Sequence, residues 1–219
     1  MKNLSLLILI LFFSFTNSQV FDNTKQIYSD PNLKEKIALQ KNVAILPFDV
    51  KITYRKQPKN FNLEANREQE KTMASTVQSA MYTFLLRKRE NYSVTFQDVE
   101  KTNVLLRRAG MLEKLDEFTK DEIAAQLGVD AVLGGKFEVE QSKSEAAAIA
   151  SAVVFGGFGG KTGTSTLTLN VTEAETGDTI WRFFKTMNDG IMTSTDDVIE
   201  RMMRKVSRNF PYLKDDAQE

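Results

Sequence analysis

The segment that most constrains the fold of this chain is a β-hairpin near its C-terminal end. Residues 164–172 alternate strictly, with Leu167, Leu169 and Val171 on one side and threonine or asparagine on the other. Such alternation is typical of a half-buried antiparallel strand. A Glu-Thr-Gly-Asp turn leads to a return strand over residues 179–185, which is apolar on both sides. We therefore expect a sheet in which this return strand lies between two layers.

The remaining segments predict helices and further strands of one mixed sheet. Strands are expected at 43–50, with a bulge or unpaired edge at Pro47, at 92–96, and at 129–140, where two glycines indicate a bulge or a close backbone contact. Helices are predicted over 64–89 and 103–112, after the capping box of Thr119 and Glu122, and from Ser194 to a point before Pro211. The expected class is α/β, a mixed sheet with helices against it.

The N-terminus has the anatomy of a secretory signal peptide. Lys2 is followed by an apolar run from Leu4 to Phe15, and cleavage after Ser18 would leave Gln19 first. The alternative is an uncleaved anchor, although the run is short for a bilayer of roughly 30 Å. We therefore divide the chain into a signal peptide (1–18), an N-terminal arm (19–41) and an α/β domain (42–212).

Two missing residue types narrow the possible functions. The chain has no cysteine, which excludes lipid anchoring through cysteine, disulfides and thiol catalysis. It has no histidine, the commonest general base and metal ligand. With 29 basic and 29 acidic residues, no global field favours nucleic acid. We expect a non-enzymatic protein without a cofactor or metal.

Residues 142–163 form an unusually long insertion between two predicted strands. One interpretation is a helix packed on the domain, rich in alanine up to Phe155. The other is an exposed apolar element for self-association or for membrane contact through residues 146–158. A phosphate-binding loop is disfavoured, because Phe155 stands where that motif needs glycine. The candidate interaction residues of this segment are Ala147, Ile149, Val153, Val154, Phe155 and Phe158.

Charged residues give two further candidate sites. Glu138 and Glu140 share one side of a predicted strand, so they are either an acid/base pair or part of a solvated surface. The last helix carries a basic stripe, which either complements the negative end of the helix dipole or docks an acidic partner. That stripe consists of Arg201, Arg204, Lys205 and Arg208.

Several motifs together resemble the CsgG/LpoB/TolB N-terminal group of bacterial envelope proteins. The opening strand Val-Ala-Ile-Leu-Pro-Phe (43–48) and the stretch Leu-Gly-Val-Asp-Ala-Val-Leu-Gly-Gly-Lys (127–136) are similar to segments of that group. Phe-Gly-Gly-Phe-Gly-Gly (155–160), the strand at 167–171 and Thr-Gly-Asp-Thr-Ile-Trp (176–181) resemble the loop, strand and hairpin of the curli secretion channel subunit CsgG.

The resemblance implies a three-layer sandwich of the anticodon-binding-domain kind that acts in the periplasm or at the outer membrane. It implies envelope proteins, or further copies of the same chain, as partners. Only residues 142–163 stand where the first barrel hairpin of CsgG would be, and the lipid-bearing cysteine is missing. We therefore expect protein binding or self-assembly. A subunit of a curli-type outer-membrane channel and a carboxylate-based cell-wall hydrolase are the alternatives.

Overall fold

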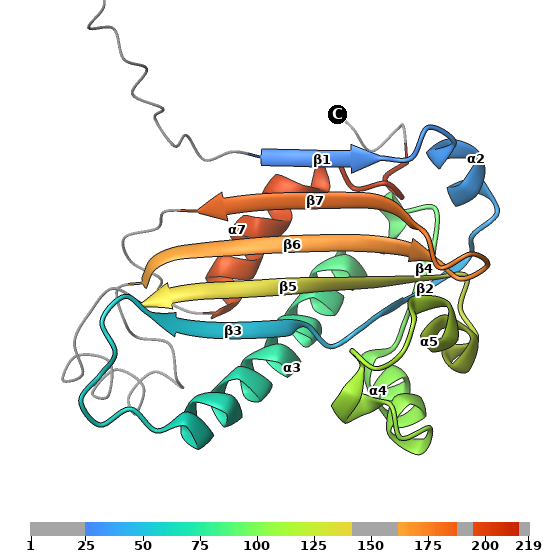
Figure 1. Ribbon diagram of the computed structural model, residues 1–219. Helices are drawn as coiled ribbons and strands as arrows, with labels where there is room; N and C mark the ends of the chain where they lie inside the picture. Colours follow the sequence, from blue (N-terminus) through green and yellow to red (C-terminus); the bar gives the residue numbers. More distant parts are fainter. Residues whose placement is uncertain (1–24, 142–161, 188–194, 215–219) are drawn as a thin grey trace, which may run out of the picture.

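The computed structural model of the chain describes residues 25–141, 162–187 and 195–214. Its strands form one seven-stranded sheet with the order β1-β7-β6-β5-β2-β4, and β3 also pairs with β5 (Figure 1). The strands β2, β3, β4 and β5 run parallel, whereas β1, β7, β6 and β5 are joined in antiparallel pairs. The strands are β1 (Lys25–Ser29), β2 (Asn42–Ile45), β3 (Asp49–Tyr54), β4 (Thr95–Gln97), β5 (Ala131–Gln141), β6 (Thr162–Glu173) and β7 (Thr179–Met187).

Helices cover both faces of the sheet, which confirms the predicted α/β class with a mixed sheet. The long helix α3 (Leu63–Arg87) and the last helix α7 (Thr195–Ser207) run behind the sheet in Figure 1. The opposite face carries α4 (Val99–Arg108) and α5 (Lys120–Leu127), which cover only the end near β2. A short helix, α2 (Leu33–Ala38), follows β1.

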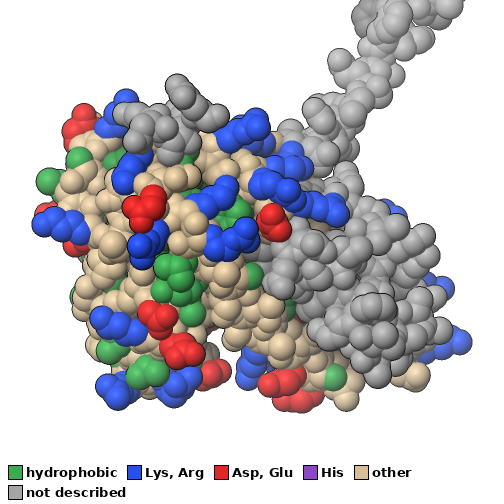
Figure 2. Space-filling model, turned by 180° about the vertical axis from the view of Figure 1, so that it is seen from behind, with side chains coloured by type: hydrophobic (Ala, Val, Ile, Leu, Met, Phe, Trp, Pro, Cys, Tyr) green, Lys and Arg blue, Asp and Glu red, His purple; other side chains and the backbone are tan. Residues whose placement is uncertain are grey.

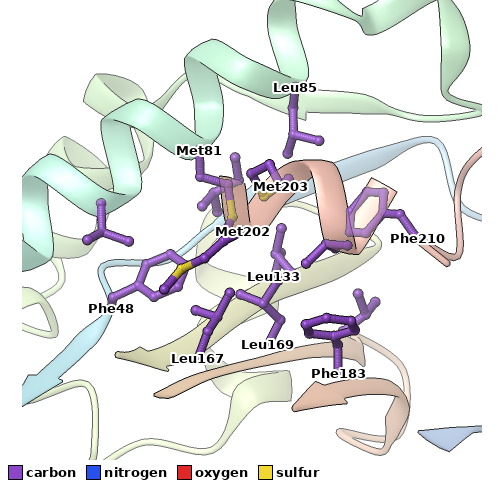
Figure 3. Close-up of a cluster of buried hydrophobic side chains, with 14 of the residues drawn as sticks. Phe48, Met81, Leu85, Leu133, Leu167, Leu169, Phe183, Met202, Met203 and Phe210 are labelled. Carbon is purple, nitrogen blue, oxygen red and sulfur yellow. The ribbon is translucent and has the colours of Figure 1, made fainter. Parts of the chain in front are cut away.

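Two buried clusters hold these layers together. The larger one joins the sheet to α3 and α7, and Figure 3 shows Met81 and Leu85 meeting Met202 and Met203 above Leu133. The smaller one packs α4 and α5 against the other face of β2 and β5. Neighbouring residues of one strand therefore serve different layers, as alternation along a strand requires.

Local signals in the sequence place several element ends correctly. The predicted capping box is present, and the backbone N–H of Thr119 donates to Glu122 Oε2 over 2.9 Å. Gly128 ends α5 with a φ of 62°, a left-handed conformation that glycine adopts without strain. In the β6–β7 hairpin, Leu167, Leu169 and Val171 are buried, and Phe183 and Trp181 lie opposite Leu169 and Val171 on the neighbouring strand.

The predicted strand at 43–50 is two strands. Both β2 and β3 pair with β5, and one more residue lies between Ile45 and Asp49 than between their partners Leu133 and Lys136. That extra residue is the bulge expected at Pro47, which has no N–H to donate to the ladder. The second strand also extends beyond the predicted end at residue 50, because β3 continues to Tyr54 with Val50 and Ile52 buried.

The N-terminal arm contributes to the sheet. β1 pairs with β7 along its whole length, and α2 follows it. All five residues of β1 are exposed, so their side chains gave no alternating signal in the sequence. Residues 1–24, with the predicted signal peptide, lie outside the described residues, as does most of the insertion at 142–163.

The glycine pair in β5 has two different roles. A Cβ on Gly135 would lie 2.6 Å from both the Phe48 ring and the backbone oxygen of Thr168, distances that no real Cβ tolerates. A Cβ on Gly134 would meet only Leu46 Cδ1, at 3.9 Å. The close backbone contact predicted for this pair is therefore confirmed at Gly135, where β5 and β6 approach each other beneath Phe48.

This difference gives a matched pair of variants. We expect Gly135→Ala to lower the free energy of unfolding by about 1–3 kcal/mol, because the backbone must shift to admit the methyl group. Gly134→Ala should leave it unchanged or raise it by about 0.5 kcal/mol, since alanine loses less backbone entropy than glycine. Urea denaturation of both variants measures the difference, and equal losses would contradict the packing described here.

Candidate functional site

The last helix is amphipathic and is fixed to the body by its apolar side. Met202, Met203 and Val206 of α7 are each at most 4% exposed and pack against α3 and the sheet. The spacing of three and four residues places them on one side of the helix. The opposite side therefore faces solvent, and it carries the basic stripe predicted from the sequence.

The structure separates the four residues of the basic stripe into two kinds. Arg204, Lys205 and Arg208 are exposed, and none of the described carboxylates lies within ion-pair distance of them. Arg201 is half-buried and interacts with another part of the chain. Within the described part of the chain, three of the four thus have no carboxylate to pair with, whereas Arg201 already makes an interaction.

An open groove of about 560 Å³ lies between α3 and α7. Its floor is a row of small side chains on α3, and Glu200 of α7 stands on the other side. The hydroxyls of Ser75, Thr76 and Thr83 donate to backbone carbonyls four residues earlier, over 3.4, 3.0 and 2.9 Å. The floor consequently has few free donors. The groove is lined by Ser75, Thr76, Ser79, Ala80, Thr83, Phe84, Arg87 and Glu200.

Basic side chains are concentrated toward the C-terminal ends of the two helices that form this groove. Residues 84–91 and 200–208 together hold seven Lys and Arg side chains, against Glu90 and Glu200 as the only acids in those two stretches. Arg87 lines the groove itself, and Lys88 lies over the Phe84 ring with Nζ 4.9 Å from its centroid. Figure 2 views this side of the molecule and shows Lys and Arg side chains gathered over its upper part.

An aromatic cluster fixes the end of α7 next to the end of α3. Phe210, which follows α7, has its ring centroid 5.6 Å from that of Tyr92 and 5.7 Å from that of Trp181. The chain then pairs with the segment after α3, where the N–H of Ser93 donates to the oxygen of Tyr212 over 2.9 Å. The basic C-terminal ends of both helices therefore lie on the same part of the surface.

We call this region the α3–α7 surface, meaning the groove residues together with Arg204, Lys205 and Arg208. The sequence predicted the α7 side but missed the α3 side. On the α3 side, the sequence pattern is a run of small residues on the side of the helix opposite its buried residues Met73, Val77 and Met81. The run consists of Ser75, Thr76, Ser79, Ala80 and Thr83. Small polar residues on the outer side of a helix are common, so this run could not by itself indicate a groove.

The structure does not place the two candidate acids of β5 at this surface. Glu138 and Glu140 lie on the opposite face of the sheet from the buried Phe137 and Val139. Glu138 Oε1 lies 2.8 Å from Lys136 Nζ, and this contact raises the pKa of Lys136 above its usual value. Neither acid lines the groove. Glu138 is therefore part of an ion pair on a partly exposed sheet face, which is the solvated alternative considered above.

The other candidate interaction residues lie outside the described part of the chain. Ala147, Ile149, Val153, Val154, Phe155 and Phe158 all belong to the stretch 142–161. Among the described residues, no three acidic side chains gather as a metal site would require. No helix in the described part is both long and apolar enough to cross a membrane.

Comparison with known proteins gives only remote similarities. No protein-family model and no curated protein matches the sequence. Among solved structures, the PelC dodecamer from Paraburkholderia phytofirmans is similar, with a TM-score of 0.36 and 15% identity over 88% of this chain and 99% of that chain. Lipoprotein GNA1162 from Neisseria meningitidis has a TM-score of 0.39 and 11% identity, over 77% of this chain and 94% of that chain.

LpoB, a member of the group that the sequence motifs resemble, is also among the similar structures. The E. coli protein has a TM-score of 0.37 and 12% identity, over 73% of this chain and 65% of that chain. Similarity to LpoB, PelC and GNA1162 is therefore present at low identity. At such TM-scores and identities it says nothing of what this chain binds.

The two sides of α7 should respond differently to truncation. We expect Met203→Ala to lower the free energy of unfolding by about 2–4 kcal/mol, because it opens a cavity between α7 and α3. The neighbouring Arg204→Ala should change it by less than about 0.5 kcal/mol, since Arg204 is exposed. Chemical denaturation of both variants tests the orientation of the helix. A larger loss for Arg204→Ala would contradict it.

The aromatic cluster predicts a loss of stability at alkaline pH. Burial raises the pKa of Tyr92 to about 12, so on raising the pH its phenol ionises first in the unfolded chain, at roughly pH 10. Its contribution is complete below pH 10 and is lost as the pH rises toward 12, with a slope of up to about 1.4 kcal/mol per pH unit. We expect Tyr92→Phe to reduce that slope in denaturation experiments across this window. An unchanged slope would contradict the burial of the hydroxyl.

Proposed function

We propose that this chain is an exported, non-enzymatic protein that binds an acidic segment of another envelope protein on the α3–α7 surface. Export is inferred from the predicted signal peptide. The observation that carries the proposal is a group of exposed cations, Arg204, Lys205 and Arg208, that have no carboxylate partner among the described residues. They lie on the same helix as Glu200, which lines the groove together with Arg87.

The groove is large enough for a short segment of a partner protein but too small for a whole domain. Its volume of about 560 Å³ falls within the range of roughly 300–1,000 Å³ that is typical of binding pockets. Such a space admits a few side chains of a helix or an extended segment, which is how many domains recognise peptides. Carboxylates on that segment would meet the arginines, whose planar guanidinium groups can hold them through two hydrogen bonds each.

The chemistry of the chain supports binding over catalysis. It has neither histidine nor cysteine, so catalysis would depend on carboxylates, lysine or hydroxyls. Of the two acids proposed for a hydrolase, Glu138 is held by Lys136 and both lie away from the groove. Among the described residues that line the groove, Glu200 is the one acid, whereas a glycosidase needs two carboxylates about 5–10 Å apart.

A charge-reversal variant tests this proposal. We expect the triple variant Arg204→Glu, Lys205→Glu and Arg208→Glu to lose the partners that the wild-type protein captures from envelope extract. Once a partner is purified, its affinity should fall by roughly a hundredfold or more, since like charges then oppose each other. Affinity for the wild type should also fall with rising salt, because the cations are exposed. Isothermal titration at two salt concentrations measures both effects.

The matched control reverses three exposed basic residues on a helix of the other face, Lys101, Arg107 and Arg108 of α4. It changes net charge equally and should leave binding within about twofold of wild type. Equal losses of affinity in both variants would show that net charge, and not the α3–α7 surface, determines binding. A purified partner that binds the α7 variant as tightly as wild type would refute the proposed surface.

A further inference from the structure

The edge strands of the sheet differ in whether their outward backbone groups are protected from pairing with another strand. At β3, the N–H of Ile52 donates to Glu70 Oε1 over 2.8 Å, and Asn66 Nδ2 donates to the oxygen of Ile52 over 3.3 Å. Side chains of α3 thus occupy backbone groups that another strand would otherwise need. The edge strand β4 is only three residues long. Short length and occupied backbone groups are common ways in which proteins prevent edge-to-edge pairing.

The edge at β1 has no such protection within the described residues. Its five residues are all exposed, and the described part of the chain offers no backbone or side-chain partner on its outer side. Two of the exposed large apolar residues lie in this strand, with Ile27 38% and Tyr28 49% exposed. An open, partly apolar edge is a template for pairing with another strand.

The register with β7 tells which backbone groups point outward. The N–H of Asp30 donates to the oxygen of Ile180, its opposite residue when the β1–β7 register is continued past Ser29 and Trp181. Residues at every second position of an antiparallel strand share the same direction of hydrogen bonding. Gln26 and Tyr28 therefore bond to β7, and the backbone groups of Lys25, Ile27 and Ser29 point away from the sheet.

This outward set is symmetric about Ile27. If a second β1 strand pairs antiparallel with the first about a twofold axis at Ile27, Ile27 meets Ile27 of the partner subunit and Lys25 meets Ser29 of the partner subunit. Each of these opposite pairs can exchange two backbone bonds, roughly six in total. No like charges stand opposite each other, and the two isoleucines form a favourable cross-strand pair. A twofold axis requires this kind of self-complementary patch.

We propose that two copies of this chain pair through β1 to form a dimer with one continuous sheet. The occupant of the edge is a second copy, because the strand is complementary to itself in backbone groups, charge and apolar contact. The inference uses a different part of the molecule from the α3–α7 surface, so it stands or falls separately from the proposed function. Five residues per strand give a small interface, and the dimer should therefore dissociate on dilution.

Sedimentation equilibrium of residues 19–219, which contain every described element, tests the dimer over a roughly hundredfold range of concentration. We expect Ile27→Pro to raise the dimer dissociation constant roughly tenfold or more, because proline removes the outward N–H in both copies. The bonds to β7 come from Gln26 and Tyr28, so the thermal midpoint should stay within a few degrees of wild type. Ile27→Val keeps the N–H and should keep the dimer.

A cross-linking experiment locates the axis. Ile27→Cys gives a chain with a single thiol, because the sequence has no cysteine. Opposite residues in such a pair lie about 5.5 Å apart, so a short thiol-to-thiol reagent should join two copies in high yield. Leu63→Cys, 54% exposed at the start of α3 and far from β1, should not cross-link. A wild-type protein that is monomeric throughout, or a dimer that Ile27→Pro leaves intact, overturns the proposal.

Discussion

The contact on which the rest of the structure depends is the close approach of β5 to β6 at Gly135. β5 pairs with β2 and β3 along one edge and with β6 along the other, so it joins the parallel and antiparallel halves of the sheet. Phe48, from the bulge between β2 and β3, lies directly over Gly135. The bulge at Pro47 and the glycine in β5 are thus parts of one packing arrangement, because the absent side chain of Gly135 makes room for the ring.

The same strand explains why the two faces of the sheet are covered unequally. Leu133, Phe137 and Val139 point toward α3 and α7 along most of β5. On the other face only Val132 packs under α4 and α5, and Lys136 and Glu138 follow in the open. Along this side of β5, the change from the apolar Val132 to the charged Lys136 and Glu138 marks where the layer of α4 and α5 ends. The layer of α3 and α7 is packed against the sheet over a longer stretch, so a binding surface on it is held rigidly.

Residue patterns predicted the parts of the fold that are fixed locally. The hairpin at β6–β7, the capping box of α5 and the bulge at Pro47 follow from alternation, side-chain capping and a missing N–H. The sequence did not predict β1, because its stability comes from pairing with β7, more than 150 residues later, and all of its side chains are exposed. The groove was also missed, since it depends on where α7 lies across small residues of α3.

The basic residues of α7 and the open edge of β1 are supported as binding sites by different kinds of evidence. Basic side chains near the end of a helix complement its dipole, so the stripe by itself would need no partner. Its position on a helix that borders a groove, with Arg204, Lys205 and Arg208 paired to no described carboxylate, goes beyond that requirement. For β1, the evidence comes from comparing it with β3, another edge strand of the same sheet. Asn66 and Glu70 block the backbone of β3, whereas no described residue blocks β1. We therefore interpret the open edge of β1 as a pairing site and not as an unavoidable consequence of the topology.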